Sequence, residues 1–283
     1  VKVNISLMNF LGISKSYTNK KWVGPSEHDL QQALLYSKRL CIPQLSAYQL
    51  IKNNIQEGDF FDYVSPKIKN LIPNPKIFLD MEKGALRLLR AIEQKEKIAI
   101  FADYDVDGTV SAALISLWLR NFGIKPTIYI PDRETEGYGP NIKAMNKLAL
   151  NHSLIICVDC GTDTEDAIRG ATERGVDVIV IDHHRSDTFS RSAYAIINPN
   201  RFDEKNIFGY LCAAGVVFIF LVEMNSIMPK NSSSNINLLS YLNLVSLATI
   251  ADVVPLIGLN RAFVKQGLKT VSYTHLTLPT IVS

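Results

Sequence analysis

The chain is organised around one short stretch, Lys97-Ile-Ala-Ile-Phe-Ala-Asp-Tyr-Asp-Val-Asp-Gly108. An apolar run leads into three carboxylates at alternating positions, Asp103, Asp105 and Asp107, and an apolar helical pattern follows them. Carboxylates this close repel one another and lose water at a packed strand end, so such clusters persist mainly where a divalent cation neutralises them. The alternative is a solvated acidic turn between a strand and a helix. The rest of the chain decides between the two interpretations.

Alternating strand and helix patterns follow from this stretch onward. Apolar runs predict strands at residues 98–102, 127–130, 154–158, 176–181 and 194–197. Helical periodicity predicts helices between them at residues 110–122, 141–150 and 164–174. This order predicts an α/β fold, a mostly parallel sheet with helices on both faces. Functional groups gather at the carboxyl ends of the strands in such sheets, where three predicted strands end in acids or acid–histidine pairs.

The residues on either side of this pattern are predicted to be helical. Residues 1–95 show helical periodicity broken by Gly and Pro turns, with Asp80 expected to be the N-cap of the last helix in this region. Beyond the sheet, apolar helices are predicted at residues 211–224 and 238–249. Asp252 follows in strongly apolar company. A buried lone carboxylate needs a partner, and a metal ion would serve.

Composition and charge are those of a globular protein. Of the 283 residues, 47% are hydrophobic and 20% are charged, enough for one large or two ordinary domains. The net charge of +3 does not by itself indicate nucleic-acid binding, although it is compatible with a local basic groove. No run of ~18 apolar residues predicts a membrane span. The chain starts at Val1 without a signal-peptide pattern, and we expect it to be a fragment.

The four cysteines have no disulfide-framework spacing, which favours a reducing, cytoplasmic location. Cys157 and Cys160 form a CxxC on an apolar strand run, without a second such pair in the chain. We interpret them as two small packed residues that flank Asp159, rather than as a redox or zinc site.

Seven residues at strand and helix ends have the chemistry of a cation site: Asp103, Asp105, Asp107, Asp159, His183, His184 and Asp252. Carboxylates with one or two imidazoles suit Mn²⁺ or Mg²⁺ rather than zinc held by thiolates. The acids suffice for two ions that share a bridging carboxylate, and two ions can generate a hydroxide and stabilise an attack on phosphorus. His184, if it is not a ligand, would donate a hydrogen bond to a phosphate oxygen or the leaving group. Asp182 would orient an imidazole from behind the ligands.

A phosphatase of the haloacid-dehalogenase-like class is the main rival interpretation. Asp105-Val-Asp-Gly-Thr109 after an apolar strand fits the pattern of that class, with Asp105 as the nucleophile and Asp107 as the general acid and base. This interpretation leaves Asp103, Asp159 and the two histidines without a role. It also requires a later Lys and a paired-acid motif, which the sequence does not place convincingly.

Four motifs resemble, in order, those of the DHH phosphoesterase family. They are Asp103-Tyr-Asp-Val-Asp-Gly108, Val158-Asp-Cys-Gly161, Ile181-Asp-His-His184 and Ala251-Asp-Val-Val-Pro-Leu256. The resemblance is strongest to the RecJ single-stranded-DNA exonucleases of that family. Segments 130–141, 197–199 and 214–216 are similar to RecJ sequences as well, as are Lys21-Trp22 and residues 73–81.

The resemblance implies a hydrolase that uses Mn²⁺ or Mg²⁺, with two ions, and degrades single-stranded DNA from the 5′ end in repair and recombination. It implies metal ligands at Asp103, Asp105, Asp107, Asp159, His183 and Asp252, with Asp159 as the bridge. His184 would contact the scissile phosphate, and Arg133, Tyr138 and Asn141 would line the substrate path. The implied partners are single-stranded DNA, a single-strand-binding protein and a helicase, with no membrane.

In terms of domains, we expect an N-terminal helical region at 1–95, a DHH phosphoesterase domain at 96–270 and a non-native tail at 271–283. The DHH-associated and OB-fold domains of RecJ-like proteins are expected to be absent, so that the chain alone would bind metal but cleave poorly. Two further alternatives stay open: a DHH enzyme acting on oligonucleotides or cyclic dinucleotides, and a DNA-binding scaffold of the same fold.

Overall fold

The chain divides into two compact units, Val1–Val64 and Ser65–Ser283. The computed structural model describes residues 10–205, 207–229 and 236–274 of them. We expected the division near residue 95, and the structure instead groups residues 65–95 with the sheet, because the helix at residues 81–93 packs on it. Most of the expected tail at 271–283, from residue 275 onward, lies outside the described residues.

The first unit consists of short helices, as expected from its periodicity. They are η2 (Phe10–Gly12), α1 (Glu27–Leu40), α2 (Gln44–Lys52), η3 (Glu57–Asp59) and α3 (Phe60–Val64). A capping box begins α1: the Ser26 hydroxyl accepts from the Asp29 amide, and the Asp29 carboxylate accepts from the Ser26 amide. Lys52 of α2 pairs with Asp29 at 2.9 Å, which joins the two helices.

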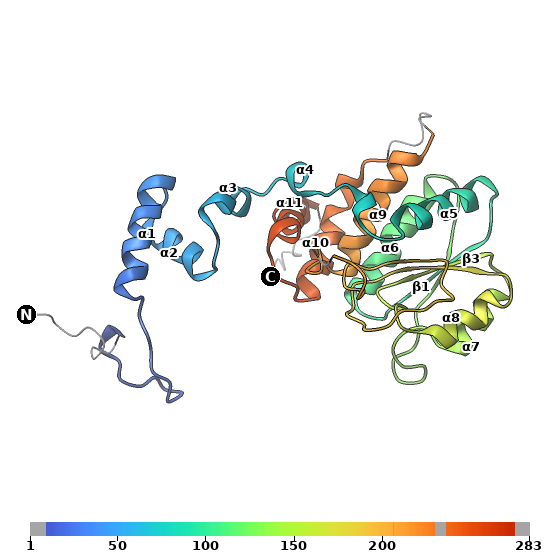
Figure 1. The fold of residues 1–283 in the computed structure, drawn as a ribbon, viewed down its shortest axis with the longest axis horizontal. Helices are drawn as coiled ribbons and strands as arrows, with labels where there is room; N and C mark the ends of the chain where they lie inside the picture. The colour runs from blue at the N-terminus through green and yellow to red at the C-terminus, as the bar shows by residue number, and fades with distance from the viewer. Residues whose placement is uncertain (1–9, 206, 230–235, 275–283) are drawn as a thin grey trace, which may run out of the picture. The chain divides into compact units, whose positions relative to one another are not determined.

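The second unit is built on a five-stranded sheet (Figure 1). Its strands are β1 (Ile98–Ala102), β2 (Thr127–Tyr129), β3 (Leu154–Val158), β4 (Asp177–Ile181) and β5 (Ala195–Ile197). They lie in the order β2-β1-β3-β4-β5, and every neighbouring pair is parallel. The strand order therefore reverses beside β1. In sheets of this class the ligand site lies at such a reversal, outside the carboxyl ends of the strands.

Helices cover both faces of this sheet, which confirms the predicted α/β class. The helices of the unit are α4 (Ile68–Leu71), η4 (Pro75–Ile77), α5 (Met81–Glu93), α6 (Val106–Arg120), α7 (Ile142–Ala149), α8 (Glu165–Thr172), α9 (Ala213–Ile227), η5 (Leu238–Tyr241), α10 (Leu242–Ala251) and α11 (Gly258–Thr274). In Figure 1, α7 and α8 lie on one side of the sheet, and α5, α6 and α9 lie on the other. No helix within the described ranges is long and apolar enough to cross a membrane.

The core follows from the alternation of side chains along each buried strand. In β1, Ile98, Ile100 and Ala102 pack with α5, α6 and α9, whereas Ala99 and Phe101 pack with α7 and α8. All five side chains are buried, so the strand reads as a continuous apolar run rather than as an alternating one. This packing fixes where each strand ends, and therefore which residues reach the carboxyl-end edge.

The start of α6 and the role of Asp80 before α5 differ from the sequence expectations. α6 begins at Val106 instead of residue 110, because Asp105 acts as its N-cap and accepts a hydrogen bond from the Gly108 amide at 2.9 Å. Asp80 precedes α5 as expected, but it makes no capping hydrogen bond there. Its carboxylate instead accepts from the Ile196 amide and from Arg201, and so fixes the start of α5 to β5.

Candidate metal centre

The carboxyl ends of β1, β3 and β4 and the end of α10 bring all seven predicted cation-site residues together. Three overlapping groups each place their ligand atoms within 4.8 Å of one another: Asp103/Asp105/Asp159, Asp107/His183/Asp252 and Asp159/His183/His184. Asp159 and His183 each belong to two groups. The structure therefore gathers the seven residues at the edge where the sequence placed them.

The β1–α6 junction supplies three of the carboxylates. Asp103 ends the strand and is 4% exposed, and burial raises its pKa above the ordinary range. A glycine must stand at position 108, since a Cβ there would come within 2.6 Å of the Asp103 carbonyl oxygen. Asp107 points into the protein from the first turn of α6. Its two oxygens accept from the Ala213 and Ala214 amides, at 2.6 and 2.8 Å, at the start of α9.

Asp159 follows β3 in a strained backbone conformation. Its φ is +60°, a region that residues other than glycine visit rarely, and its side chain is 1% exposed. Burial raises the pKa of Asp159 far above its usual value, and the nearby Asp107, Asp105 and Asp182 raise it further. Strain of this kind persists where the surrounding structure enforces it, most often at functional sites.

The end of β4 carries the two imidazoles and the acid that orients them. Nε2 of His183 lies 3.3 Å from Asp159 Oδ1, 3.7 Å from Asp252 Oδ2 and 3.9 Å from Asp107 Oδ2. Nδ1 of His184 lies 2.8 Å from Asp182 Oδ1, and this contact raises the pKa of His184. Burial would raise the pKa of Asp182, but its hydrogen bonds with His184 and Thr162 outweigh burial and lower it.

Asp252 reaches the same cluster from the C-cap of α10. Burial raises the pKa of its carboxyl. This agrees with the expectation that a carboxylate among apolar residues is costly. The next residue, Val253, has a φ of +58°, which is strained for a β-branched side chain. A second position of backbone strain thus lies next to a predicted ligand.

The donor set fits divalent cations. Among the described residues, no hydrogen bond reaches Asp103 Oδ1, Asp159 Oδ1 or Asp252 Oδ2, although all three atoms are buried. A buried carboxylate oxygen without a donor is costly, and no Lys or Arg among the described residues pairs with these three acids. Carboxylate oxygens plus imidazole nitrogen are the ligands that Mn²⁺ accepts, and carboxylates alone suit Mg²⁺. A pair of such ions would satisfy the three unpaired oxygens.

The three residues expected along the substrate path lie on the segment between β2 and α7. The Tyr138 hydroxyl donates to the Asp159 carbonyl at 3.2 Å and lies 3.2 Å from His184 Nδ1, and burial raises its pKa. The Arg133 guanidinium lies 5.4 Å from the centre of the Tyr104 ring, beside the β1 acids. Asn141 caps α7 by accepting from the Ala144 amide at 2.8 Å, so at least its carbonyl oxygen has a structural use.

The geometry weakens the phosphatase interpretation of the β1 acids. Both oxygens of Asp107 accept backbone hydrogen bonds from the start of α9, which holds this carboxylate in the protein instead of leaving it free as a general acid and base. Asp105 caps α6 through one oxygen. The same interpretation also fails to account for the convergence of Asp159 and His183 on these acids.

The sequence did not predict the residues that hydrogen-bond to Asp182 and to the backbone of the two histidines. Thr162 donates to Asp182 at 2.6 Å, and Asn198 and Asn200 donate to main-chain carbonyls of the histidine pair. The only sequence signal was the similarity of segments 197–199 and 214–216 to RecJ sequences, which gave no role to any side chain.

Comparisons with known proteins find related sequences and structures. Residues 97–249 match the DHH family, N-terminal domain. The single-stranded-DNA-specific exonuclease RecJ of Bacillus subtilis (strain 168) is 35% identical over 196 residues, which are 69% of this chain and 24% of that protein. A crystal structure of exonuclease RecJ bound to manganese is 31% identical, covers 71% of this chain and 49% of that chain, and gives a TM-score of 0.61.

A second crystal structure, of RecJ in complex with Mn²⁺ from Thermus thermophilus, is 26% identical. It covers 88% of this chain and 34% of that chain, with a TM-score of 0.67. The chain thus spans about a quarter of the length of its Bacillus relative and less than half of either crystallised chain.

Proposed function

Since this chain belongs to the DHH family, we propose that it hydrolyses phosphodiester bonds with bound Mn²⁺ or Mg²⁺, as a 5′-to-3′ exonuclease on single-stranded DNA. The observation that carries the proposal is that, among the described residues, one buried oxygen of each of Asp103, Asp159 and Asp252 has no donor, and that these acids lie in ligand groups joined by Asp159 and His183. RecJ relatives named as single-stranded-DNA-specific exonucleases support the choice of substrate.

The ligands in this proposal are Asp103, Asp105, Asp107, Asp159, His183 and Asp252. Two divalent cations, when bound, would supply a hydroxide at neutral pH and charge stabilisation for an in-line attack on phosphorus. Asp159 is the carboxylate best placed to be shared, because it lies in two of the three ligand groups. Asp107 keeps lone pairs for a cation while the start of α9 holds it in one orientation.

His184 contacts the scissile phosphate in this proposal. Its Nδ1 faces Asp182 at 2.8 Å, so the carboxylate sets the orientation of the ring. Nε2, which lies 3.4 Å from the Tyr138 hydroxyl, would then face a substrate oxygen beside that hydroxyl. The Tyr138 hydroxyl flanks the same ring and keeps its proton because burial raises its pKa. Arg133 would pair with a backbone phosphate of the strand, since guanidinium is a bidentate phosphate donor.

The proposal is tested by digestion of 5′-phosphorylated single strands with Mn²⁺, against duplex DNA, a dinucleotide and p-nitrophenyl phosphate. We expect single strands to be degraded, and Asp105→Ala and His183→Ala to abolish the reaction. Activity confined to p-nitrophenyl phosphate, or activity that survives both substitutions, would contradict the proposal. Preference for the dinucleotide would favour the oligonucleotide phosphodiesterase alternative instead.

We extend the proposal to a cytoplasmic location, which the four free cysteine thiols support. A single-strand-binding protein and a helicase are proposed as partners only from the resemblance of the four motifs to those of RecJ. The test is co-purification of either protein with this chain, with and without nuclease treatment. Co-purification that nuclease abolishes indicates contact through DNA, and co-purification that survives nuclease indicates direct contact.

A further inference from the structure

A segment that contributes no ligand lies directly behind the histidine pair. Asn198 follows β5 and is fully buried, and its Nδ2 donates to the His184 carbonyl and to the Thr162 hydroxyl, both at 2.9 Å. Two residues on, Nδ2 of Asn200 donates to the His183 carbonyl at 2.6 Å and to the Gly209 carbonyl at 2.9 Å.

The two asparagines are also fixed relative to each other. The Asn200 amide donates to Asn198 Oδ1 at 2.8 Å, and Pro199 between them has a φ restricted by its ring. Because both Nδ2 atoms bond two acceptors each, neither side chain can turn away without breaking two hydrogen bonds. The pair therefore forms a rigid clamp, here called the asparagine clamp (Asn198 and Asn200).

Asp182 holds the same peptide groups from the opposite side. Its Oδ1 accepts from the His183 amide at 2.7 Å and from the His184 amide at 3.2 Å. The peptide between the two histidines is thus held at its N–H by Asp182 and at its carbonyl by Asn200. The peptide after His184 is held at its carbonyl by Asn198. Fixed peptide planes set the direction of each Cα–Cβ bond, and hence where each imidazole points.

We propose that Asn198 and Asn200 are positioning residues for the two imidazoles of this site. The inference rests on the proposed function, in which His183 binds a cation and His184 contacts the phosphate. Asn200 holds the peptide shared by both histidines, so it positions both rings. Asn198 bonds the histidine pair directly only at the carbonyl after His184. It reaches His183 only through Asn200 and through Thr162, which holds Asp182, so it positions the His184 ring more directly than the His183 ring. The two asparagines therefore differ in what their loss disturbs.

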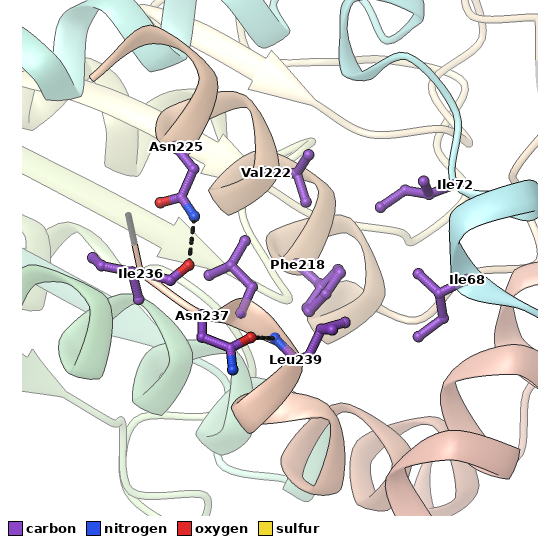
Figure 2. Close-up of a pocket in the computed structure, with 9 residues that line it drawn as sticks. Ile68, Ile72, Phe218, Val222, Asn225, Ile236, Asn237 and Leu239 are labelled. Atoms are coloured by element: carbon purple, nitrogen blue, oxygen red, sulfur yellow. Dashed lines mark hydrogen bonds between the residues drawn. The ribbon is translucent and has the colours of Figure 1, made fainter. Parts of the chain in front are cut away.

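The test compares Asn198→Ala and Asn200→Ala in the full chain, with Asn198→Ser and Asn200→Ser as second variants that keep a donor. Asn225→Ala is the matched control. Asn225 also donates to a main-chain carbonyl, that of Ile236 at 2.8 Å, but it does so beside an apolar groove lined by α9 and η5 (Figure 2). Its other bonded partner is Trp118, which belongs to no part of the candidate centre.

Three readouts are taken for each variant: the dissociation constant for Mn²⁺ alone by electron paramagnetic resonance, kcat and KM on single-stranded DNA, and the imidazole NMR resonances of the metal-free chain. For Asn200→Ala we expect Mn²⁺ affinity and kcat both to fall by ~10–100-fold, the usual cost of losing a partner behind a metal ligand. For Asn198→Ala we expect kcat to fall more than Mn²⁺ affinity, and the His184 resonances to move more than those of His183, because Asn198 reaches His183 only through Asn200 and Thr162. The serine variants should recover part of each loss.

The clamp is overturned if the asparagine variants behave as Asn225→Ala does, with lower thermal stability but unchanged Mn²⁺ affinity, kcat and imidazole resonances. It is also overturned if Asn198→Ala moves the His183 and His184 resonances alike. A wild-type chain that binds Mn²⁺ but cleaves no DNA would contradict the proposed function alone. The Mn²⁺ affinities and imidazole resonances would still show whether the asparagine clamp positions the histidines.

Discussion

The two edges of the sheet both contain buried charges, and they treat those charges in opposite ways. At the amino-end edge, Arg87 of α5 is 4% exposed and bonds to Asp177 at the start of β4, to Glu96 and to the Ser153 carbonyl. At the carboxyl-end edge, Asp103, Asp159 and Asp252 each have a buried oxygen that no donor reaches within the part of the chain that the structure describes. One edge is neutralised by the chain itself, and the other requires a charge from outside.

This difference shows how a cluster of charges that stabilises the fold can be distinguished from one that binds a ligand. An internal ion pair in which each side chain has its partners needs nothing further, and it ties elements together. A carboxylate cluster without a cationic side chain costs stability unless a ligand neutralises it, and such costs are retained at sites that bind ions. The backbone strain at Asp159 and Val253 lies on the carboxyl-end edge as well.

The largest effect is expected from Asp159→Asn, which keeps the shape of the side chain but removes its charge. DNA digestion should fall by more than the ~100-fold that losing a partner behind a ligand costs, because a shared ligand is lost. The metal-free variant should melt at a higher temperature than the metal-free wild type, because a buried carboxylate without a donor is gone. Activity assays and thermal melts in EDTA measure both. The exposed Asp163→Asn is the control, and a lower melting temperature for Asp159→Asn would contradict this account.

The second largest effect is expected from Arg87→Met at the other edge. Losing the buried Arg87 leaves Glu96 without its cation and Asp177 with only the half-exposed Arg90, which should lower the free energy of unfolding by ~3–5 kcal/mol. Denaturant unfolding measures the change, and added Mn²⁺ should not reverse it. Arg90→Ala is the matched control: Arg90 contacts the same Asp177 at 3.3 Å but is half exposed, so its loss should cost ~0–1 kcal/mol. Equal costs for the two substitutions would remove the distinction between a buried and a surface pair.

The smallest effect is expected from Glu165→Gln at the start of α8, a carboxylate that does have donors. Its oxygens accept from the hydroxyls of Ser190 and Ser192 and from two amides, which lowers the pKa of Glu165 to about 2. The loss should be ~1 kcal/mol at neutral pH, already reduced for the exposure of this side chain.

A depressed folded pKa stabilises the protein above the unfolded value of 4.5, and that contribution disappears as pH falls toward 2. The difference between Glu165→Gln and wild type should therefore be constant above pH 4.5 and shrink below it. Melting curves of both chains across this pH range measure the difference. Asp166→Asn, at a side chain that is 73% exposed, is the control. A difference that grows as the pH falls would contradict the assignment.

Much of this arrangement could be predicted from sequence because it depends on residue type and period. Buried parallel strands are continuous apolar runs, so the sequence predicts where each strand ends. The parallel topology then places Asp103, Asp159 and His183 at one edge of the sheet. The start of α6 was placed four residues late, because an apolar period says nothing about a capping carboxylate such as Asp105.

Other parts could not be predicted, because they depend on contacts between distant segments. Arg87 and Asp177 are 90 positions apart, and neither is unusual in its local sequence. The amides of Ala213 and Ala214 hold Asp107 through the backbone, which leaves no mark on residue type. Asn198 and Asn200 look like ordinary turn residues beside a proline. Only the three-dimensional arrangement shows that they support the histidines.

The most direct test of the central claim is a titration of the wild-type chain and of Asp159→Asn with Mn²⁺, followed by electron paramagnetic resonance. The account predicts saturable binding of two ions by the wild type, with at least one ion lost in the variant, because Asp159 belongs to two ligand groups. An Arg87→Met chain that is still folded should bind as the wild type does. Absence of saturable binding by the wild type, or an unchanged stoichiometry in Asp159→Asn, would contradict a cation site at the carboxyl-end edge.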